Sequence, residues 1–200
     1  MRNWIKEKKM KVIFLDLDGT ICLSNNWGGR SKKWGKYRSE NPETSKFMKD
    51  APVEVRFDDF DKKAIKVLNE ILEETESEIV VSSDWRCHAT LEELGEYFLS
   101  QGILKKPVGV TKLLGQCNQP ENYPWLQKWD VEQSRSLEIL QYLFDHPEVS
   151  QWVAVDDLDM GKNGEEWKDW GLDNFVLTPS RTEGIKQFGI KEKIIKFLKQ

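Results

Sequence analysis

The stretch that decides the fold runs from Val12 to Thr20 and reads VIFLDLDGT. Its first four residues form a continuous apolar run, which is typical of a strand that is buried on both faces. Asp16 and Asp18 follow at a spacing of two, so their carboxylates point the same way if the chain stays extended. Gly19 permits a turn in which backbone N–H groups approach a phosphate. This stretch therefore predicts a buried strand that ends in a pair of acidic side chains.

Two further apolar runs also end in polar residues. Residues 78–83 read EIVVSS, and residues 152–157 read WVAVDD. Shorter runs at 108–110 and 175–177 are candidates for additional strands. Apolar residues at helical spacing separate these runs, and they predict helices over residues 58–76, 91–100, 134–144 and 190–198. In the third of these helices the residues on one side are Leu137, Leu140, Leu143 and Phe144.

Strands that alternate with helices predict an α/β fold, in which a parallel sheet is covered by helices on both faces. Ligands bind such sheets outside the carboxyl ends of the strands. If the strands are neighbours, the polar residues that follow three of the runs converge on one spot. These residues are Asp16, Asp18, Ser82, Ser83, Asp156 and Asp157.

The length of 200 residues predicts one domain over residues 1–200, with a small insertion. Lys and Arg number 30 against 34 Asp and Glu, a net charge of −4, which argues against a general electrostatic nucleic-acid binder. Residues 24–50 are locally basic, with seven basic and three acidic residues, and show no clear periodicity. We interpret them as a long functional loop or small flap, and assign a basic flap or minimal cap to residues 24–57.

Two neighbouring carboxylates suit phosphoryl transfer, because one can attack phosphorus while the other exchanges protons with the leaving group and with water. The pattern of apolar run, Asp, x, Asp, x, Thr resembles the first motif of the haloacid dehalogenase-like (HAD) superfamily of phosphotransferases. It stands here as residues 12–15, Asp16, Leu17, Asp18, Gly19 and Thr20. The resemblance implies a Rossmann-like three-layer sandwich, Mg²⁺ and an aspartyl-phosphate intermediate. It implies that Asp16 is nucleophile and metal ligand, and that Asp18 is acid/base with its backbone carbonyl on the metal.

The other HAD motifs are matched by shorter signals. Ser82, with Ser83 as the alternative, follows a strand and would bind a phosphoryl oxygen. Asp156 and Asp157 follow a later strand and would complete the metal site, with Asp159 as a further candidate ligand. The cation that steadies charge near the nucleophile is assigned to Arg135, at the start of a predicted helix. Lys112 is its competitor.

The layout is most similar to the HAD domains of RNA-repair (Swiss Army Knife) proteins, over about residues 12–180. This similarity rests on residues 82–86, 109–111 and 135–139, the last of which precede the strand that ends at Asp157. It implies a polynucleotide phosphate end as substrate. The basic flap could follow a nucleic-acid backbone, and Trp27 or Trp34 could stack on a base. The residues assigned to substrate binding are Gly19, Thr20, Ser83, Arg86, Lys112, Trp27 and Trp34.

Two other functions stay open: a small-metabolite or nucleotide phosphatase, and a non-catalytic binding protein with the HAD fold. For Arg86 the alternative to a phosphate ligand is a surface ion pair. The nine tryptophans could form an aromatic wall at the catalytic edge or fill space under long loops. Three cysteines without paired spacing favour reduced thiols, and no apolar stretch is long enough to span a membrane. We expect a cytoplasmic protein, with the nucleus as an alternative, and no obligate protein partner.

Overall fold

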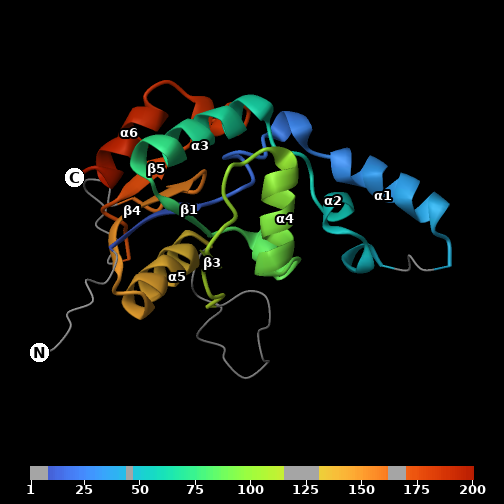
Figure 1. Ribbon diagram of the computed structural model, residues 1–200, viewed down its shortest axis with the longest axis horizontal. Helices are drawn as coiled ribbons and strands as arrows, with labels where there is room; N and C mark the ends of the chain where they lie inside the picture. Colours follow the sequence, from blue (N-terminus) through green and yellow to red (C-terminus); the bar gives the residue numbers. More distant parts are fainter. Residues whose placement is uncertain (1–8, 44–46, 115–130, 162–169) are drawn as a thin grey trace, which may run out of the picture.

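A computed structural model describes residues 9–43, 47–114, 131–161 and 170–200, and all structural statements below concern these residues. A five-stranded sheet forms the centre of the molecule (Figure 1). The strands stand in the order β3-β2-β1-β4-β5, and every neighbouring pair is parallel. Their bounds are β1 Met10–Leu15, β2 Glu78–Val81, β3 Gly109–Val110, β4 Val149–Asp156 and β5 Phe175–Leu177. This arrangement confirms the predicted α/β class with a parallel central sheet.

Side chains alternate between the two faces of the sheet, and each face packs against different helices. On β1, Ile13 and Leu15 join a core with residues of α3 (Lys62–Thr75) and α6 (Ile190–Leu198). Val12 and Phe14 join a second core with residues of α5 (Val131–Asp145). Figure 1 shows α3 and α6 together on one side of the sheet and α5 on the other. The continuous apolar run is therefore explained by burial on both faces, which gives a three-layer sandwich.

The order of the strands brings the ends of β1, β2 and β4 together. The chain moves outward from β1 through β2 to β3, and then returns to the other side of β1 with β4. Backbone hydrogen bonds extend the pairing beyond the strand ends, from Asp16 N to Val155 O (3.0 Å) and from Ser82 N to Leu15 O (2.9 Å). The residues that follow β1 thus lie between those at the ends of its two neighbours, where such sheets bind ligands.

Local signals account for the helix ends. The Asp61 carboxylate accepts hydrogen bonds from two backbone N–H groups and caps α3. Thr90 and Glu93 form a capping box at the start of α4 (Leu91–Gln101), and Gly102 ends this helix in the left-handed conformation. The predicted helix over residues 58–76 is therefore shorter in the structure, because the residues before Asp61 lead into the cap.

The segment predicted as a loop or small flap contains a helix, which the sequence analysis missed. It comprises a 3-10 turn η1 (Ser24–Asn26), the helix α1 (Gly29–Glu40), a second 3-10 turn η2 (Met48–Asp50) and the short helix α2 (Val53–Arg56). No residue of α1 is buried. In Figure 1 this helix projects sideways from the body, beyond α2 and α4. A helix that buries no residue needs no apolar stripe, so its sequence lacks helical periodicity.

The helix α5 turns only part of its predicted apolar side toward the sheet, where Leu143 packs partly buried against the core. Its buried residues include Arg135, Glu138 and Tyr142, whereas Leu140 and Phe144 are exposed. The helix was predicted, but its apolar side is not the side that meets the sheet at the carboxyl edge. At that edge the buried side of α5 carries polar residues, among them Arg135, which contacts the acidic residues at the strand ends.

Two smaller findings concern cysteines and membranes. Cys22 is free and buried, but Cys87, in the 3-10 turn η3 (Asp84–Cys87), is disulfide-bonded, so the expectation of reduced thiols is wrong for Cys87. Cys117 and the predicted loop over residues 116–130 lie outside the described residues. Within the described ranges, no helix is long and apolar enough to cross the membrane.

Candidate active site

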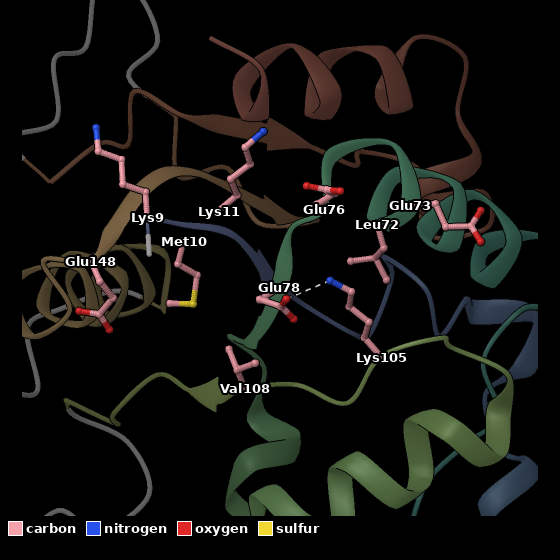
Figure 2. A pocket seen from close by; sticks show the side chains of 10 residues that line it. All are labelled: Lys9, Met10, Lys11, Leu72, Glu73, Glu76, Glu78, Lys105, Val108 and Glu148. Atoms are coloured by element: carbon pink, nitrogen blue, oxygen red, sulfur yellow. Dashed lines mark hydrogen bonds and ion pairs between the residues drawn. The ribbon is translucent and has the colours of Figure 1, made fainter. Parts of the chain in front are cut away.

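A cavity of about 190 Å³ lies at the carboxyl edge of the sheet. It is lined by Asp16, Asp18, Trp27, Ser83, Asp84, Val131, Arg135, Asp157, Leu158 and Arg181. A larger cavity of about 730 Å³ lies at the opposite, amino edge, where Lys9, Lys11, Glu78 and Glu148 are among its lining residues (Figure 2). Because parallel sheets bind ligands at their carboxyl ends, and because the smaller cavity gathers the predicted motifs, we place the chemistry there.

A buried arginine bridges the residues at the ends of the two central strands. Arg135 Nη1 donates to Asp16 Oδ1 at 2.7 Å and to Asp156 Oδ2 at 2.9 Å, and Arg135 Nη2 donates to Asp84 Oδ1 at 3.2 Å. The side chains of Arg135, Asp16 and Asp156 are 7%, 3% and 1% exposed. A cation in this position compensates two buried carboxylates, which would otherwise be costly to remove from water.

Burial, and to a smaller extent their mutual proximity, raises the pKa values of the clustered carboxyl groups. Burial is the main cause of the raised pKa of Asp16; the charge of Asp156 adds to it, and Arg135 opposes it. Burial raises the pKa of Asp156 to about 6, although Arg135 again opposes the change. Burial acts to lower the pKa of Arg135, but the charges of Asp16 and Asp156 outweigh it and raise that pKa. Arg135 therefore stays protonated, while the carboxyl groups bind a proton or a cation readily.

Three carboxylates are close enough to share one metal ion. Asp16, Asp156 and Asp157 each offer an oxygen, and these oxygens lie within 4.8 Å of one another. An all-carboxylate donor set suits a hard cation such as Mg²⁺. The residues present thus fit the metal that the HAD motifs imply. Asp159 is not part of this group, and its carboxylate accepts a hydrogen bond from the backbone of Gly161 (3.1 Å).

Asp18 lies at the cavity and has its own hydrogen-bond donors. Trp85 Nε1 donates to Asp18 Oδ2 at 2.8 Å. Asp18 is exposed to solvent, yet neighbouring groups partly desolvate its carboxylate, which raises its pKa. The hydrogen bonds from Trp85 and from the Cys22 thiol lower the pKa and so oppose that effect. The carboxylate is thus oriented from one side and open to the cavity.

The serines and the turn residues of the first two motifs occupy different places. Both serines are buried, but Ser83 lines the cavity, whereas Ser82 does not and its hydroxyl has no hydrogen-bond partner among the described residues. The N–H of Gly19 donates to Cys22 O (2.9 Å). The Thr20 hydroxyl is buried and hydrogen-bonds that of Thr178 (3.2 Å). The structure therefore leaves both serines as candidates for a phosphoryl oxygen and turns the Thr20 side chain toward the loop after β5.

Four of the predicted site residues lie in distinct surroundings. Trp27 lines the cavity, is 43% exposed and donates its indole N–H to Cys22 O (3.1 Å). Trp34 stacks on Tyr37 within α1, outside the cavity lining. Arg86 pairs with Glu138, and both side chains are buried. Lys112 pairs with Asp145 and is 73% exposed. Arg135, and not Lys112, is therefore the cation beside Asp16 in this structure.

Sequence reasoning missed two charged residues of the cavity. Asp84 contacts Arg135, and Arg181 donates through Nε to Asp157 Oδ2. Arg181 follows the three-residue strand β5 in a loop that carries no motif. Backbone hydrogen bonds from Ser24 N to Arg181 O (2.9 Å) and from Ile185 N to Thr20 O (3.0 Å) hold this loop against the segment after β1. No pattern in the sequence predicts such a contact between loops that are distant along the chain.

The comparison with known families decides where the chain belongs. The family described as the HAD domain in Swiss Army Knife RNA repair proteins matches residues 12–187. The chain belongs to this family. No curated protein and no solved structure matches it.

Membership of a HAD domain family agrees with what the site contains. The match begins within β1, includes Asp16 after it, and extends through β4 and the loop after β5. The family supports a phosphohydrolase of the HAD type, and the acidic cluster is where such an enzyme would bind its metal. The similarity to RNA-repair HAD domains that the sequence analysis stated is confirmed.

Proposed function

We propose that this protein is a Mg²⁺-dependent phosphohydrolase that acts through an aspartyl-phosphate at Asp16. The observation that carries the proposal is the meeting of Asp16 with Asp156, Asp157 and the buried Arg135 at the carboxyl edge of the sheet. Asp18 lies in the same cavity, so a nucleophile and a proton-exchanging group are both present. Membership of the HAD family supports this assignment.

The reaction has two balanced steps. In the first, a carboxylate oxygen of Asp16 attacks phosphorus, the bond from phosphorus to the leaving oxygen breaks, and that oxygen takes a proton from Asp18. In the second, Asp18 takes a proton from water, the water oxygen attacks phosphorus, and the bond from phosphorus to Asp16 breaks. Inorganic phosphate leaves, and both carboxyl groups return to their starting states.

The charges around the phosphoryl group are balanced by cations. Asp16, Asp156 and Asp157, together with the backbone carbonyl of Asp18, would hold Mg²⁺. When bound, Mg²⁺ supplies positive charge that offsets the repulsion between a carboxylate nucleophile and a phosphate. Arg135 contributes a fixed positive charge next to Asp16, where charge develops during transfer.

We propose further that the substrate is a polynucleotide phosphate end. The helix α1 projects from the body and exposes four basic residues, and the exposed indole of Trp27 lies at the cavity. These basic residues are Arg30, Lys32, Lys36 and Arg38. A basic helix beside a phosphate-binding cavity suits a chain of phosphates, and an exposed indole suits a stacked base. A small-metabolite phosphatase would not need the helix, and a non-catalytic protein would need neither Asp16 nor Asp18.

A phosphatase panel tests the reaction. Aryl phosphate, nucleotides, and 3′- and 5′-phosphorylated oligonucleotides are incubated with the protein, with Mg²⁺ or with EDTA. We expect hydrolysis that requires Mg²⁺ and that is lost in Asp16→Asn. Asp173→Asn is the matched control, since Asp173 is exposed and precedes β5 at the amino edge of the sheet. Metal-dependent hydrolysis that survives in Asp16→Asn would overturn the mechanism.

The basic helix is tested separately from the reaction. Lys32→Glu combined with Lys36→Glu should lower kcat/KM for the oligonucleotide end, most strongly at low salt, and leave hydrolysis of the aryl phosphate unchanged. Lys193→Glu combined with Lys196→Glu changes the same charge at two exposed positions of α6, and serves as the control. Equal activity on a mononucleotide and on an oligonucleotide end, without salt dependence, would favour the small-molecule alternative.

A further inference from the structure

We propose that Trp85 is a positioning residue for Asp18, which it holds by one carboxylate oxygen so that the other exchanges the proton. This inference rests on the proposed function and names a residue that acts through the acid/base. Trp85 Nε1 donates to Asp18 Oδ2 at 2.8 Å across 67 residues of sequence. The indole is 5% exposed, so water does not compete effectively for this hydrogen bond.

Aromatic neighbours fix the direction of the indole N–H. The ring of Phe57 stacks on Trp85 with centroids 4.1 Å apart and planes inclined by 7°. Phe60 stacks on the indole at 5.4 Å, and Tyr97 packs on it at 5.9 Å with a tilt of 54°. Since a tryptophan side chain has two torsions and this one is packed by three rings, the N–H has little freedom to turn away.

The chemistry of the donor decides which oxygen of Asp18 is reactive. An indole N–H donates and cannot accept, so Asp18 Oδ2 must present a lone pair to it in both protonation states. Because a protonated carboxyl oxygen is a weaker acceptor than a carbonyl oxygen, this hydrogen bond favours Oδ1 as the oxygen that carries the proton given to a leaving group. The Cys22 thiol also hydrogen-bonds Asp18, but a thiol is a weak donor and does not fix an orientation as firmly.

A fixed carboxylate matters here because Asp18 is exposed at the cavity. An exposed aspartate without a partner samples several rotamers, and proton transfer in the first step requires one of them. Phe57 directly follows α2, so the segment that carries the basic helix also packs on the indole that orients Asp18. The aromatic stack thus connects the assigned flap to the proton-transferring group.

Trp85→Phe removes the N–H and keeps an aromatic ring in the stack, so it isolates the proposed hydrogen bond. Trp152→Phe is the matched control, because Trp152 contacts Phe14 on β1, within the core on the α5 side, and does not line the cavity. The two variants and the wild type are compared on aryl and alkyl phosphates whose leaving groups differ in basicity. We measure kcat/KM, which reports the steps up to phosphorylation of Asp16.

A leaving group of low basicity needs no proton, whereas a basic one does. We therefore expect Trp85→Phe to lower kcat/KM by about 10- to 100-fold for alkyl phosphates and by less than about 3-fold for 4-nitrophenyl phosphate. Trp152→Phe should leave both unchanged. An equal loss on all leaving groups, or no loss on any, would overturn the proposal, since a purely structural role does not depend on the leaving group.

Crystal structures of the wild type and of Trp85→Phe provide a readout that does not depend on activity. We expect Asp18 to leave its wild-type rotamer in the variant, and an unchanged rotamer would overturn the proposal. A wild type that hydrolyses no phosphate ester would refute the proposed function, while this comparison would still test the positioning. If Trp85→Phe does not fold, Phe57→Leu keeps the donor and removes one stacking face. This variant should lower kcat/KM by a few fold more for alkyl phosphates than for 4-nitrophenyl phosphate. If kcat/KM shows no such dependence on the leaving group, the proposal is overturned.

Discussion

Replacing Arg135 with methionine removes the cation that lies between two buried carboxylates and keeps most of the side-chain volume. Arg135 Nη1 contacts Asp16 at 2.7 Å and Asp156 at 2.9 Å, and all three side chains are at most 7% exposed. The substitution therefore leaves two carboxyl groups in the interior without the cation that compensates them. We expect a large loss of stability that depends on pH.

The magnitude follows from the burial of the pair. Removing one partner of a buried ion pair costs about 3–5 kcal/mol, because the remaining charge is uncompensated. For a domain of this size, each kcal/mol lowers the melting temperature by about 2–4 °C, so the expected decrease is about 6–20 °C. The same change at Lys112, whose ammonium is 73% exposed and pairs with Asp145, should cost at most about 1 kcal/mol.

The assay is urea denaturation in EDTA at pH 7 and at pH 5, for the wild type, Arg135→Met and Lys112→Met. Without Arg135, the pKa values of Asp16 and Asp156 rise further, since the group that opposed their increase is gone. A carboxyl whose folded-state pKa is raised binds its proton more tightly when folded, so stability is lost as pH rises through that pKa. The deficit of Arg135→Met should therefore be smaller at pH 5 than at pH 7.

An Arg135→Met variant that is no less stable than Lys112→Met at pH 7 would contradict this prediction. An equal deficit at both pH values would also contradict it, because the uncompensated carboxyl groups lose their charge only by protonation at the lower pH. The double variant with Asp156→Asn gives an internal check. Removing one of the two charges should recover part of the stability lost at pH 7.

Three further predictions concern the loops, the pH and the metal. Gly184→Ala should destabilise the fold by at least about 3 kcal/mol in denaturant titrations, because the added Cβ would lie 2.1 Å from Thr20 O at a positive φ of 53°. In EDTA, wild-type stability should increase as pH falls from 7 to 5, since burial raises the pKa of Asp156 to about 6 and the folded protein therefore takes up a proton in this range, and Asp156→Asn should flatten this profile. Mg²⁺ at 100 times its Kd should raise the free energy of unfolding by about 2.7 kcal/mol, and the melting temperature should rise with it. Calorimetry should show no such increase for Asp157→Asn.

Much of the fold was predictable because its signals are local. Four apolar residues before Asp16 predict a strand buried on both faces, and the runs before Ser82 and Asp156 repeat the pattern. The carboxyl ends of parallel strands share one edge, so these ends were expected to converge if their strands were neighbours, and the structure places β2 and β4 on either side of β1. The structure brings Asp16, Asp156 and Asp157 within 4.8 Å of one another at that edge.

The helix faces were harder to predict, for two different reasons. The helix α1 was missed because it buries no residue, so its sequence carries no apolar stripe. In α5 the exposed side carries Leu140 and Phe144, while the buried side includes Arg135 and Glu138. A rule that sends apolar residues inward misses this polar part of the buried side, because Arg135 is buried in ion pairs with Asp16 and Asp156.

The sequence by itself determined the strands and covering helices of the central sandwich, the acidic pair after β1 and the family to which the chain belongs. The tertiary structure decided the partners: Arg135 and not Lys112 beside Asp16, Arg86 in a buried pair with Glu138, and Trp85 on Asp18. These contacts join residues that are 52 to 119 positions apart. Periodicity and motifs describe neighbours along the chain, whereas the direction of a buried side chain depends on what the rest of the fold packs against it.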